Sequence, residues 1–150
     1  MKQIHTILLP LLLVTLSGCA HTETNHYDTG ESNKPPIVKE LAKSTKTWDG
    51  ATLPEYPQGQ PEVTIFHITI HPGTQLPLHH HPVINAGVLL EGELTVVRQD
   101  GKNLKLKAGD PIIELVNTPH YGMNESDEPA VIIVVYAGTK GNPITVLTQP

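Results

Sequence analysis

Short apolar runs alternate with turn residues from Trp48 onward. The first run, EVTIFHITIH from Glu62 to His71, is rich in β-branched residues and ends at Pro72-Gly73. The later runs have the same character: Val83 to Leu90, Leu94 to Arg98, Leu104 to Leu106, Pro111 to Val116, Ala130 to Tyr136 and Ile144 to Leu147. No window shows a convincing helical period, and runs that recur every eight to twelve residues or so are typical of an antiparallel sandwich or barrel. The pattern therefore predicts an all-β domain that closes into a barrel.

Residues 1–47 follow a different pattern. One lysine, an apolar run of ten residues from Ile7 to Leu16 and then small residues are typical of a secretory signal peptide, and ten residues are too few to span a bilayer. Residues 19–47 are polar and low in large apolar side chains, so we expect a flexible linker, in which a short helix at Ile37 to Lys43 could not stand alone. The predicted organisation is a signal peptide at residues 1–18, this linker, and one folded domain at residues 48–150.

The boundary Leu16-Ser17-Gly18-Cys19 resembles the bacterial lipobox, in which the cysteine is acylated and becomes the first residue of the mature protein. The resemblance implies a lipid anchor at Cys19 and attachment to the membrane through that anchor alone. Ala20 is not the aspartate that resembles an inner-membrane retention signal, so we expect a periplasm-facing lipoprotein of the outer membrane. The alternative is that Cys19 is an incidental thiol near an ordinary cleavage site.

Charge and cysteine content exclude several classes of function. The formal net charge is −5, and removal of Lys2 with the signal peptide leaves −6, so binding to nucleic acid has no electrostatic basis. Cys19 is the only cysteine, which leaves the folded part without a disulfide or a cysteine ligand. The chain also has no glycine-rich phosphate loop and no serine in an elbow motif.

Histidines on two separate segments are the candidate chemistry. His79 and His81 are two residues apart, so in an extended strand both imidazoles point to one face while His80 points to the other. The same parity places His120, Gly122 and Asn124 on one face of a second strand, and Gly122 has no side chain to crowd the histidine. We therefore expect three imidazoles to converge on a metal ion.

These two segments resemble the two motifs of the cupin superfamily. The first motif, G-x5-H-x-H-x3-E-x6-G, is matched at every spacing from Gly73 to Gly92, with Asn85 where the family usually has glutamate. The second motif, G-x5-P-x-G-x2-H-x3-N, is matched from Gly109 to Asn124, with Leu115 and Asn117 replacing proline and glycine. The resemblance implies a single-domain cupin jelly-roll β-barrel with a three-histidine metal site, and a homodimer paired through its sheets.

The ligand set has consequences for the ion and for what binds to it. Three neutral imidazoles leave a divalent ion with a charge of +2 and leave coordination positions open, which favours an anionic or chelating small-molecule ligand. All-nitrogen sites suit zinc, iron, manganese, nickel or copper, so the sequence does not select one. The alternative is a metal-free barrel that retains a relic histidine cluster.

Polar residues near the histidines are candidates for the chemistry. Glu114 has apolar neighbours on both sides, and we consider it as a catalytic carboxylate that is either a fourth ligand or a hydrogen-bond partner of a ligand histidine; a solvated position outside the barrel is equally compatible with the sequence. Asn85, which is at most a weak ligand, is the second catalytic candidate. Asn124 and Tyr121 are the candidates for orienting a substrate in the pocket.

Two functions from different classes follow. The first is a small metalloenzyme, oxygenase-like or isomerase-like, that acts on a compact oxygen-rich metabolite. The second is a binding or sensing module that holds a metal or small ligand without turning it over. A polar base such as Glu114 inside the pocket would favour the enzyme, whereas a purely aliphatic lining would favour binding.

Overall fold

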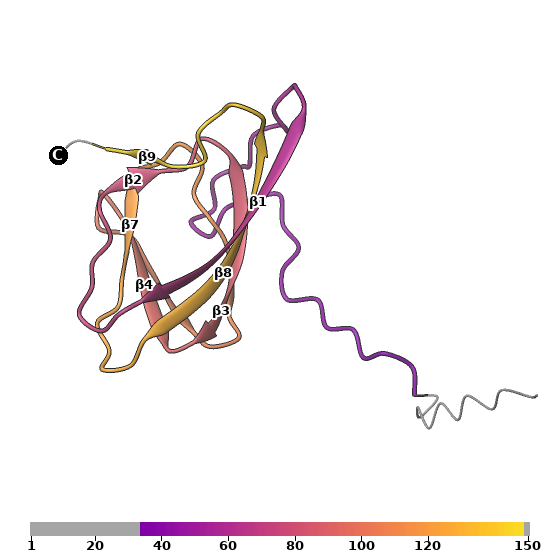
Figure 1. Cartoon of the computed structure of the whole chain (residues 1–150). Helices are drawn as coiled ribbons and strands as arrows, with labels where there is room; N and C mark the ends of the chain where they lie inside the picture. Colours follow the sequence, from indigo (N-terminus) through magenta and orange to yellow (C-terminus); the bar gives the residue numbers. More distant parts are fainter. Residues whose placement is uncertain (1–33, 149–150) are drawn as a thin grey trace, which may run out of the picture. The chain divides into compact units, whose positions relative to one another are not determined.

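The computed structural model describes residues 34–148 of the chain (Figure 1). Two units are distinguished, Met1–Ile37 and Val38–Pro150. Of the first unit, only residues 34–37 are described, and they have no regular secondary structure. The predicted signal peptide, the lipidation site at Cys19 and most of the predicted linker lie outside the described residues.

The second unit contains nine described strands in two antiparallel sheets (Figure 1). The four-stranded sheet has the order β1 (Pro61–Ile70), β8 (Ala130–Thr139), β3 (Ile84–Glu91) and β6 (Pro111–Ile113). The five-stranded sheet has the order β5 (Asn103–Lys107), β4 (Glu93–Arg98), β7 (His120–Met123), β2 (His79–His80) and β9 (Val146–Leu147). Residues 34–148 contain no helix, and therefore none that could span a membrane. The predicted all-β jelly-roll architecture is confirmed.

Alternation along the strands builds the core between the two sheets. In β8, the inward side chains of Ile132, Val134 and Tyr136 are buried, as the period of two requires. They pack with residues from both sheets, among them Leu89 of β3 and Leu94 of β4. Leu89 is fully buried, and a side chain of this kind contributes about 2 to 3 kcal/mol when it leaves water.

The strand predicted for Pro111 to Val116 ends earlier, at Ile113. The amide of Glu114 still donates to the Asn85 carbonyl at 3.0 Å, but the chain then turns, and Asn117 adopts a positive φ of 54°. Glycine is the usual residue at such a backbone position, and asparagine is one of the few others that tolerate it, which explains why Asn117 can replace the glycine of the motif. The turn carries Glu114 toward the barrel interior.

Residues 44–53 belong to the second unit and make backbone hydrogen bonds within it, whereas the sequence predicts a flexible linker up to residue 47. Lys46 and Thr52 form an isolated antiparallel bridge, and the amide of Trp48 donates to the carbonyl of Ile113 at 2.9 Å. The short helix considered at Ile37 to Lys43 is absent, since residues 34–43 have no regular secondary structure. The segment at residues 44–53 brings Trp48 to the site described next.

Candidate metal centre

Three imidazoles meet at one end of the barrel interior. His79 on β2 lies directly opposite His120 on β7 in the antiparallel register, and His81 follows His79 by two residues. The ring centroids are 4.7 to 5.1 Å apart, and one potential ligand atom from each residue lies within 4.8 Å of the other two. The convergence expected from strand parity is therefore present. His80 lies between the pair and faces the other way, with Nδ1 3.3 Å from Thr148 Oγ1.

Backbone carbonyls set the tautomer of all three rings. Nδ1 lies 2.7 Å from the carbonyl oxygen of Pro77 in His79, 2.8 Å from that of Ile144 in His81 and 2.8 Å from that of Thr118 in His120. A carbonyl oxygen can only accept, so each neutral ring carries its proton on Nδ1 and donates it there. Each Nε2 is then left with a lone pair, which is the form that binds a metal.

Burial keeps these rings neutral. Desolvation lowers the pKa of His79, His81 and His120 below the ordinary 6.5, and it takes the pKa of His81 to about 4. The neighbouring imidazoles act in the same direction, because a second positive charge in the cluster would repel the first. The hydrogen bonds to the backbone carbonyls oppose the shift without cancelling it. At neutral pH the three lone pairs are therefore available.

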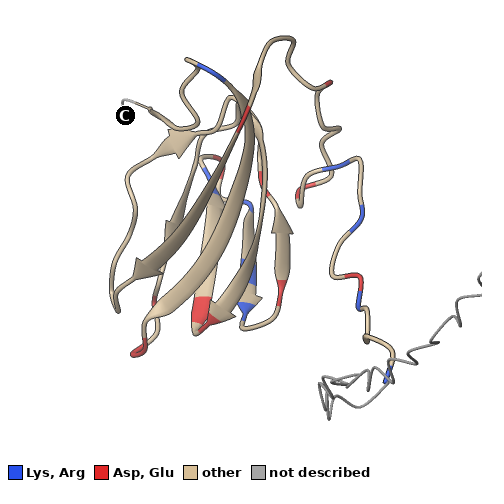
Figure 2. Ribbon diagram, turned by 45° about the vertical axis from the view of Figure 1, so that its right-hand side comes forward, with Lys and Arg blue, Asp and Glu red and all other residues tan. Residues whose placement is uncertain are grey.

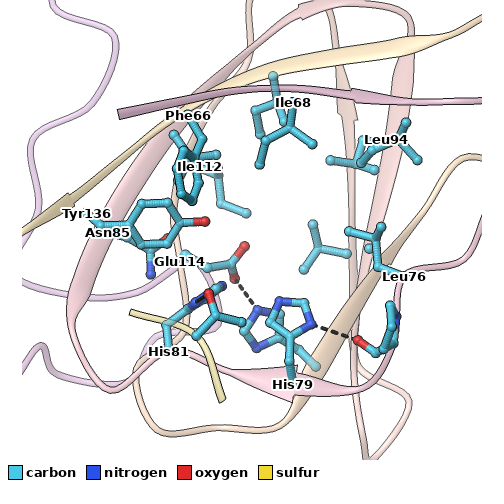
Figure 3. Close-up of a pocket in the computed structure, with 18 of the residues that line it drawn as sticks. Phe66, Ile68, Leu76, His79, His81, Asn85, Leu94, Ile112, Glu114 and Tyr136 are labelled. Atoms are coloured by element: carbon cyan, nitrogen blue, oxygen red, sulfur yellow. Dashed lines mark hydrogen bonds and ion pairs between the residues drawn. The ribbon is translucent and has the colours of Figure 1, made fainter. Parts of the chain in front are cut away.

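Glu114 lies inside the barrel, and its solvated alternative outside is wrong. Its side chain is 12% exposed, and Oε1 lies 3.8 Å from His120 Nε2 (Figure 3). The same oxygen accepts hydrogen bonds from Trp48 Nε1 at 3.1 Å and from the Leu115 amide at 2.9 Å. Desolvation raises the pKa of the Glu114 carboxyl, and the two hydrogen bonds lower it by less. Figure 3 shows the second carboxylate oxygen turned toward the cavity.

Asn85 and Tyr136 complete the polar part of the wall. Asn85 is 1% exposed; its Nδ2 donates to the Val83 carbonyl at 3.4 Å, and its Oδ1 is buried without a partner among the described residues. The hydroxyl of Tyr136 points into the cavity (Figure 3). Burial, and then the nearby Glu114 charge, raises the pKa of Tyr136 to about 12, so this hydroxyl stays protonated. Sequence reasoning missed Tyr136, although alternation along β8 places it on the inward face.

The cavity in front of these groups has a volume of about 340 Å³. Its polar lining consists of the three histidines with Glu114, Asn85, Tyr136 and Thr145. The rest of the wall is apolar apart from Gly122: Phe66, Ile68, Ile70, Leu76, Pro77, Leu94, Val96, Ile112, Ile132, Val134 and Leu147. Gly122 also lines the cavity, and a Cβ added there would be in ordinary contact with Leu76 and Leu94.

The two residues predicted to orient a substrate do not line this cavity. Asn124 Nδ2 donates to the carbonyls of Ile70 at 3.0 Å and Glu128 at 2.7 Å, and its Oδ1 accepts from the amide and the hydroxyl of Ser126. Asn124 is therefore fully engaged in holding a turn. Tyr121 lies between two inward positions of β7, so its side chain faces the other side of the sheet. The structure thus corrects both predicted pocket positions.

A comparison of the sequence with models of protein families gives the same family as the motifs, the barrel and the histidine geometry. The model described as Cupin domain matches residues 66–136, which include both histidine segments and the strands between them. The chain belongs to the cupin superfamily. No curated protein matches the chain.

Solved structures resemble this cupin in fold. The DMSP lyase DddQ from Ruegeria pomeroyi is 24% identical, with a TM-score of 0.52 over 59% of this chain and 44% of the lyase. A cupin-like protein from Thermotoga maritima is 14% identical, with a TM-score of 0.50 over 58% of this chain and 65% of the other. An uncharacterized protein with a double-stranded β-helix domain from Klebsiella pneumoniae has 24% identity and a TM-score of 0.49, and covers 80% and 90% of the two chains. This cupin therefore spans less than half of the lyase and less than two thirds of the Thermotoga protein.

The residues present in this cupin fit a divalent transition metal. One ligand atom from each histidine lies within 4.8 Å of the other two, and the Nδ1 hydrogen bonds leave Nε2 of each ring with the lone pair. The unpartnered Asn85 Oδ1 can accept a hydrogen bond from water or from a ligand. The glutamate usually found at the Asn85 position is missing, but the carboxylate of Glu114 reaches the same cluster from the end of β6. If Glu114 binds the ion, the net charge of the centre falls from +2 to +1.

Proposed function

We propose that this cupin binds one divalent transition metal ion, whether zinc, iron, manganese, nickel or copper, through Nε2 of His79, His81 and His120, and that it is a small-molecule metalloenzyme. The single observation that carries the proposal is the set of three Nδ1 hydrogen bonds to backbone carbonyls, which leaves three Nε2 atoms free within one cluster. Three protein ligands leave positions for a substrate, which is the pattern of a catalytic and not a structural centre.

Glu114 supports the catalytic form of the proposal. The bound ion would supply a positive charge that polarises an anionic or chelating substrate. Glu114 has a raised carboxyl pKa, one oxygen held by Trp48 and the other turned toward the cavity, so it can take a proton from a bound molecule and return it. Asn85 Oδ1 can accept a hydrogen bond from the same molecule. This arrangement favours an isomerase-like proton transfer, with an oxygenase-like reaction as the other candidate.

The second candidate is a module that binds or senses a metal or a small ligand without turnover. The observation that favours it is the wall of the cavity, which is apolar outside the histidine end. Glu114 distinguishes the two functions, because a binding module has no need for a proton-transfer group.

Elemental analysis of the protein tests the metal site. We expect about one equivalent of metal in wild type and in His80→Ala, since His80 faces away from the cluster. His79→Ala and His120→Ala should lose the metal, while Asn85→Ala should largely retain it. Equal metal content in all of these proteins, or loss from His80→Ala alone, would refute the assignment.

Turnover then separates catalyst from binder. The metal-loaded wild type and Glu114→Gln are screened for oxygen uptake and for exchange of substrate hydrogen with deuterated solvent. The enzyme proposal expects activity that falls at least a hundredfold in Glu114→Gln while metal content is kept. A wild type that binds ligands but shows neither activity supports the binding module.

We also propose that Cys19 carries a lipid anchor and that the domain faces the periplasm from the outer membrane. The support is the lipobox-like sequence Leu16 to Cys19. Mass spectrometry of the protein from membranes should find acyl chains on Cys19, and Cys19→Ser should move the protein to the soluble fraction. An unmodified Cys19 in membrane-bound protein would contradict the proposal.

A homodimer through the four-stranded sheet is a further proposal. The outward side chains of Val63 and Ile65 on β1 are each 64% exposed, and Figure 2 shows β1 and β8 nearly free of charged residues. An apolar sheet face of this kind is typical of an interface between copies. Sedimentation should give a dimer that Ile65→Lys converts to a monomer, and a monomeric wild type would refute it.

A further inference from the structure

The cavity has two chemically different ends. His79 and His81 lie together at one end with Glu114 beside them, whereas Ile68 and Leu94 lie at the opposite end (Figure 3). Every side chain around the far end is a hydrocarbon, drawn from both sheets. The polar groups are therefore concentrated on one side of a space that is otherwise apolar.

We propose that the natural ligand is a small amphipathic molecule, with one anionic or chelating head group at the histidine end and a compact apolar body against Ile68 and Leu94. The head-group half of this inference rests on the proposed metal site, and the apolar half does not. A volume of about 340 Å³ lies at the lower end of the range for small-molecule pockets, which limits the size of the body.

The far end selects against a polyhydroxylated body. The backbone of β4 there is paired on both sides, with β5 and β7, and β1 is paired with β8, while the side chains that line this end are all hydrocarbon. A hydroxyl group placed at this end loses its hydrogen bonds to water and finds no replacement, which lowers affinity by roughly tenfold or more per group. The compact oxygen-rich metabolite considered from sequence therefore matches only the histidine end of the cavity.

The same apolar wall favours the binding of a hydrocarbon chain. Each methylene group that moves from water into contact with these side chains strengthens binding by about fourfold. Phe66 and Leu147 line the cavity and are also exposed, so the apolar wall continues to the surface on β1 and β9. A short aliphatic or branched chain would contact the hydrocarbon wall along its whole length.

Carboxylates with the same head group and different bodies test the inference. The zinc-loaded full chain is titrated with acetate, butanoate, hexanoate and 6-hydroxyhexanoate, and binding is followed by NMR. We expect affinity to rise about fourfold per methylene from acetate to hexanoate, and to fall at least tenfold when the terminal hydroxyl is added. Equal affinity along the series, or 6-hydroxyhexanoate binding as tightly as hexanoate, would overturn the inference.

Substitutions on β1 locate the apolar subsite. Ile68→Phe fills part of the far end and should weaken hexanoate at least tenfold while acetate binding and zinc content stay unchanged. Thr69→Phe is the matched control, because Thr69 is next to Ile68 on the same strand, is exposed and does not line the cavity. Leu76→Phe, also in the cavity wall, provides a second filling variant should Ile68→Phe not fold. If both folded filling variants bind hexanoate like wild type, the subsite is misplaced.

Failure of the metal site gives a different result from failure of this inference. Zinc content is measured on the same samples, so a protein without zinc refutes the proposed function. In that case 1-butanol and 1-hexanol, titrated into the metal-free protein, still test the apolar end. Preference for hexanol, abolished by Ile68→Phe, would support it, and no preference would overturn it.

Discussion

Acidification should destabilise the metal-free protein through its buried histidines. Burial holds the pKa of His81 at about 4 in the folded protein, whereas the unfolded chain has the ordinary 6.5. Between pH 6.5 and pH 4 the unfolded state therefore binds a proton at His81 that the folded state does not bind. The unfolding free energy linked to His81 is complete above pH 6.5 and is lost as the pH falls toward 4. The difference between these two values corresponds to about 3 kcal/mol of unfolding free energy. Most domains have only about 5 to 15 kcal/mol in total.

Urea unfolding at pH 7.5 and pH 4.5, in the presence of a chelator, measures this loss. The result to compare is the change in unfolding free energy between the two pH values for wild type and for His81→Gln, which has no imidazole to protonate. We expect the change in the variant to be smaller by about 2 to 3 kcal/mol. His80→Gln is the control and should change as wild type does, because His80 faces away from the cluster. Identical pH dependence in wild type and His81→Gln would refute the reasoning.

Two further predictions concern the frame around the site. Gly92 has a φ of +73° and an added Cβ would overlap the Pro129 carbonyl oxygen, so Gly92→Ala should destabilise the protein by about 2 kcal/mol or more in urea unfolding. Gly101 also has a positive φ, but a Cβ added there would have no atom within 4 Å. If Gly101→Ala lowered the unfolding free energy as much as Gly92→Ala, the steric argument would be wrong. Trp48→Phe removes the donor to Glu114 and should cost about 1.5 to 3 kcal/mol at neutral pH; an unchanged unfolding free energy would mean that this hydrogen bond contributes nothing.

The barrel and the histidine cluster could be predicted because both depend on local periodicity. The period of two in a strand fixes which side chains share a face, and this is enough to turn His79 and His81 one way and His80 the other. The regular spacing of apolar runs likewise predicts an all-β domain. Neither inference requires knowledge of which strands pair.

Contacts between distant segments could not be predicted in this way. The position of Glu114 depends on the early end of β6 and on the indole of Trp48, which lies 66 residues away in sequence. Strand parity alone extends the strand through Val116 and leaves the direction of Glu114 open. For Asn124, strand parity predicts a position in the pocket, because Asn124 and His120 have the same parity. The strand ends at Met123, however, and the side-chain amide of Asn124 holds a turn instead.

The central claim is that three histidines with fixed tautomers hold one ion, and nitrogen NMR of the imidazoles tests it most directly. In the metal-free protein at neutral pH, we predict that His79, His81 and His120 are protonated on Nδ1 and carry a lone pair on Nε2. Addition of about one equivalent of zinc should shift the Nε2 resonances of these three rings together and leave the other histidines unchanged. Protonation on Nε2 in any of the three, or a response from fewer than three, would contradict the account.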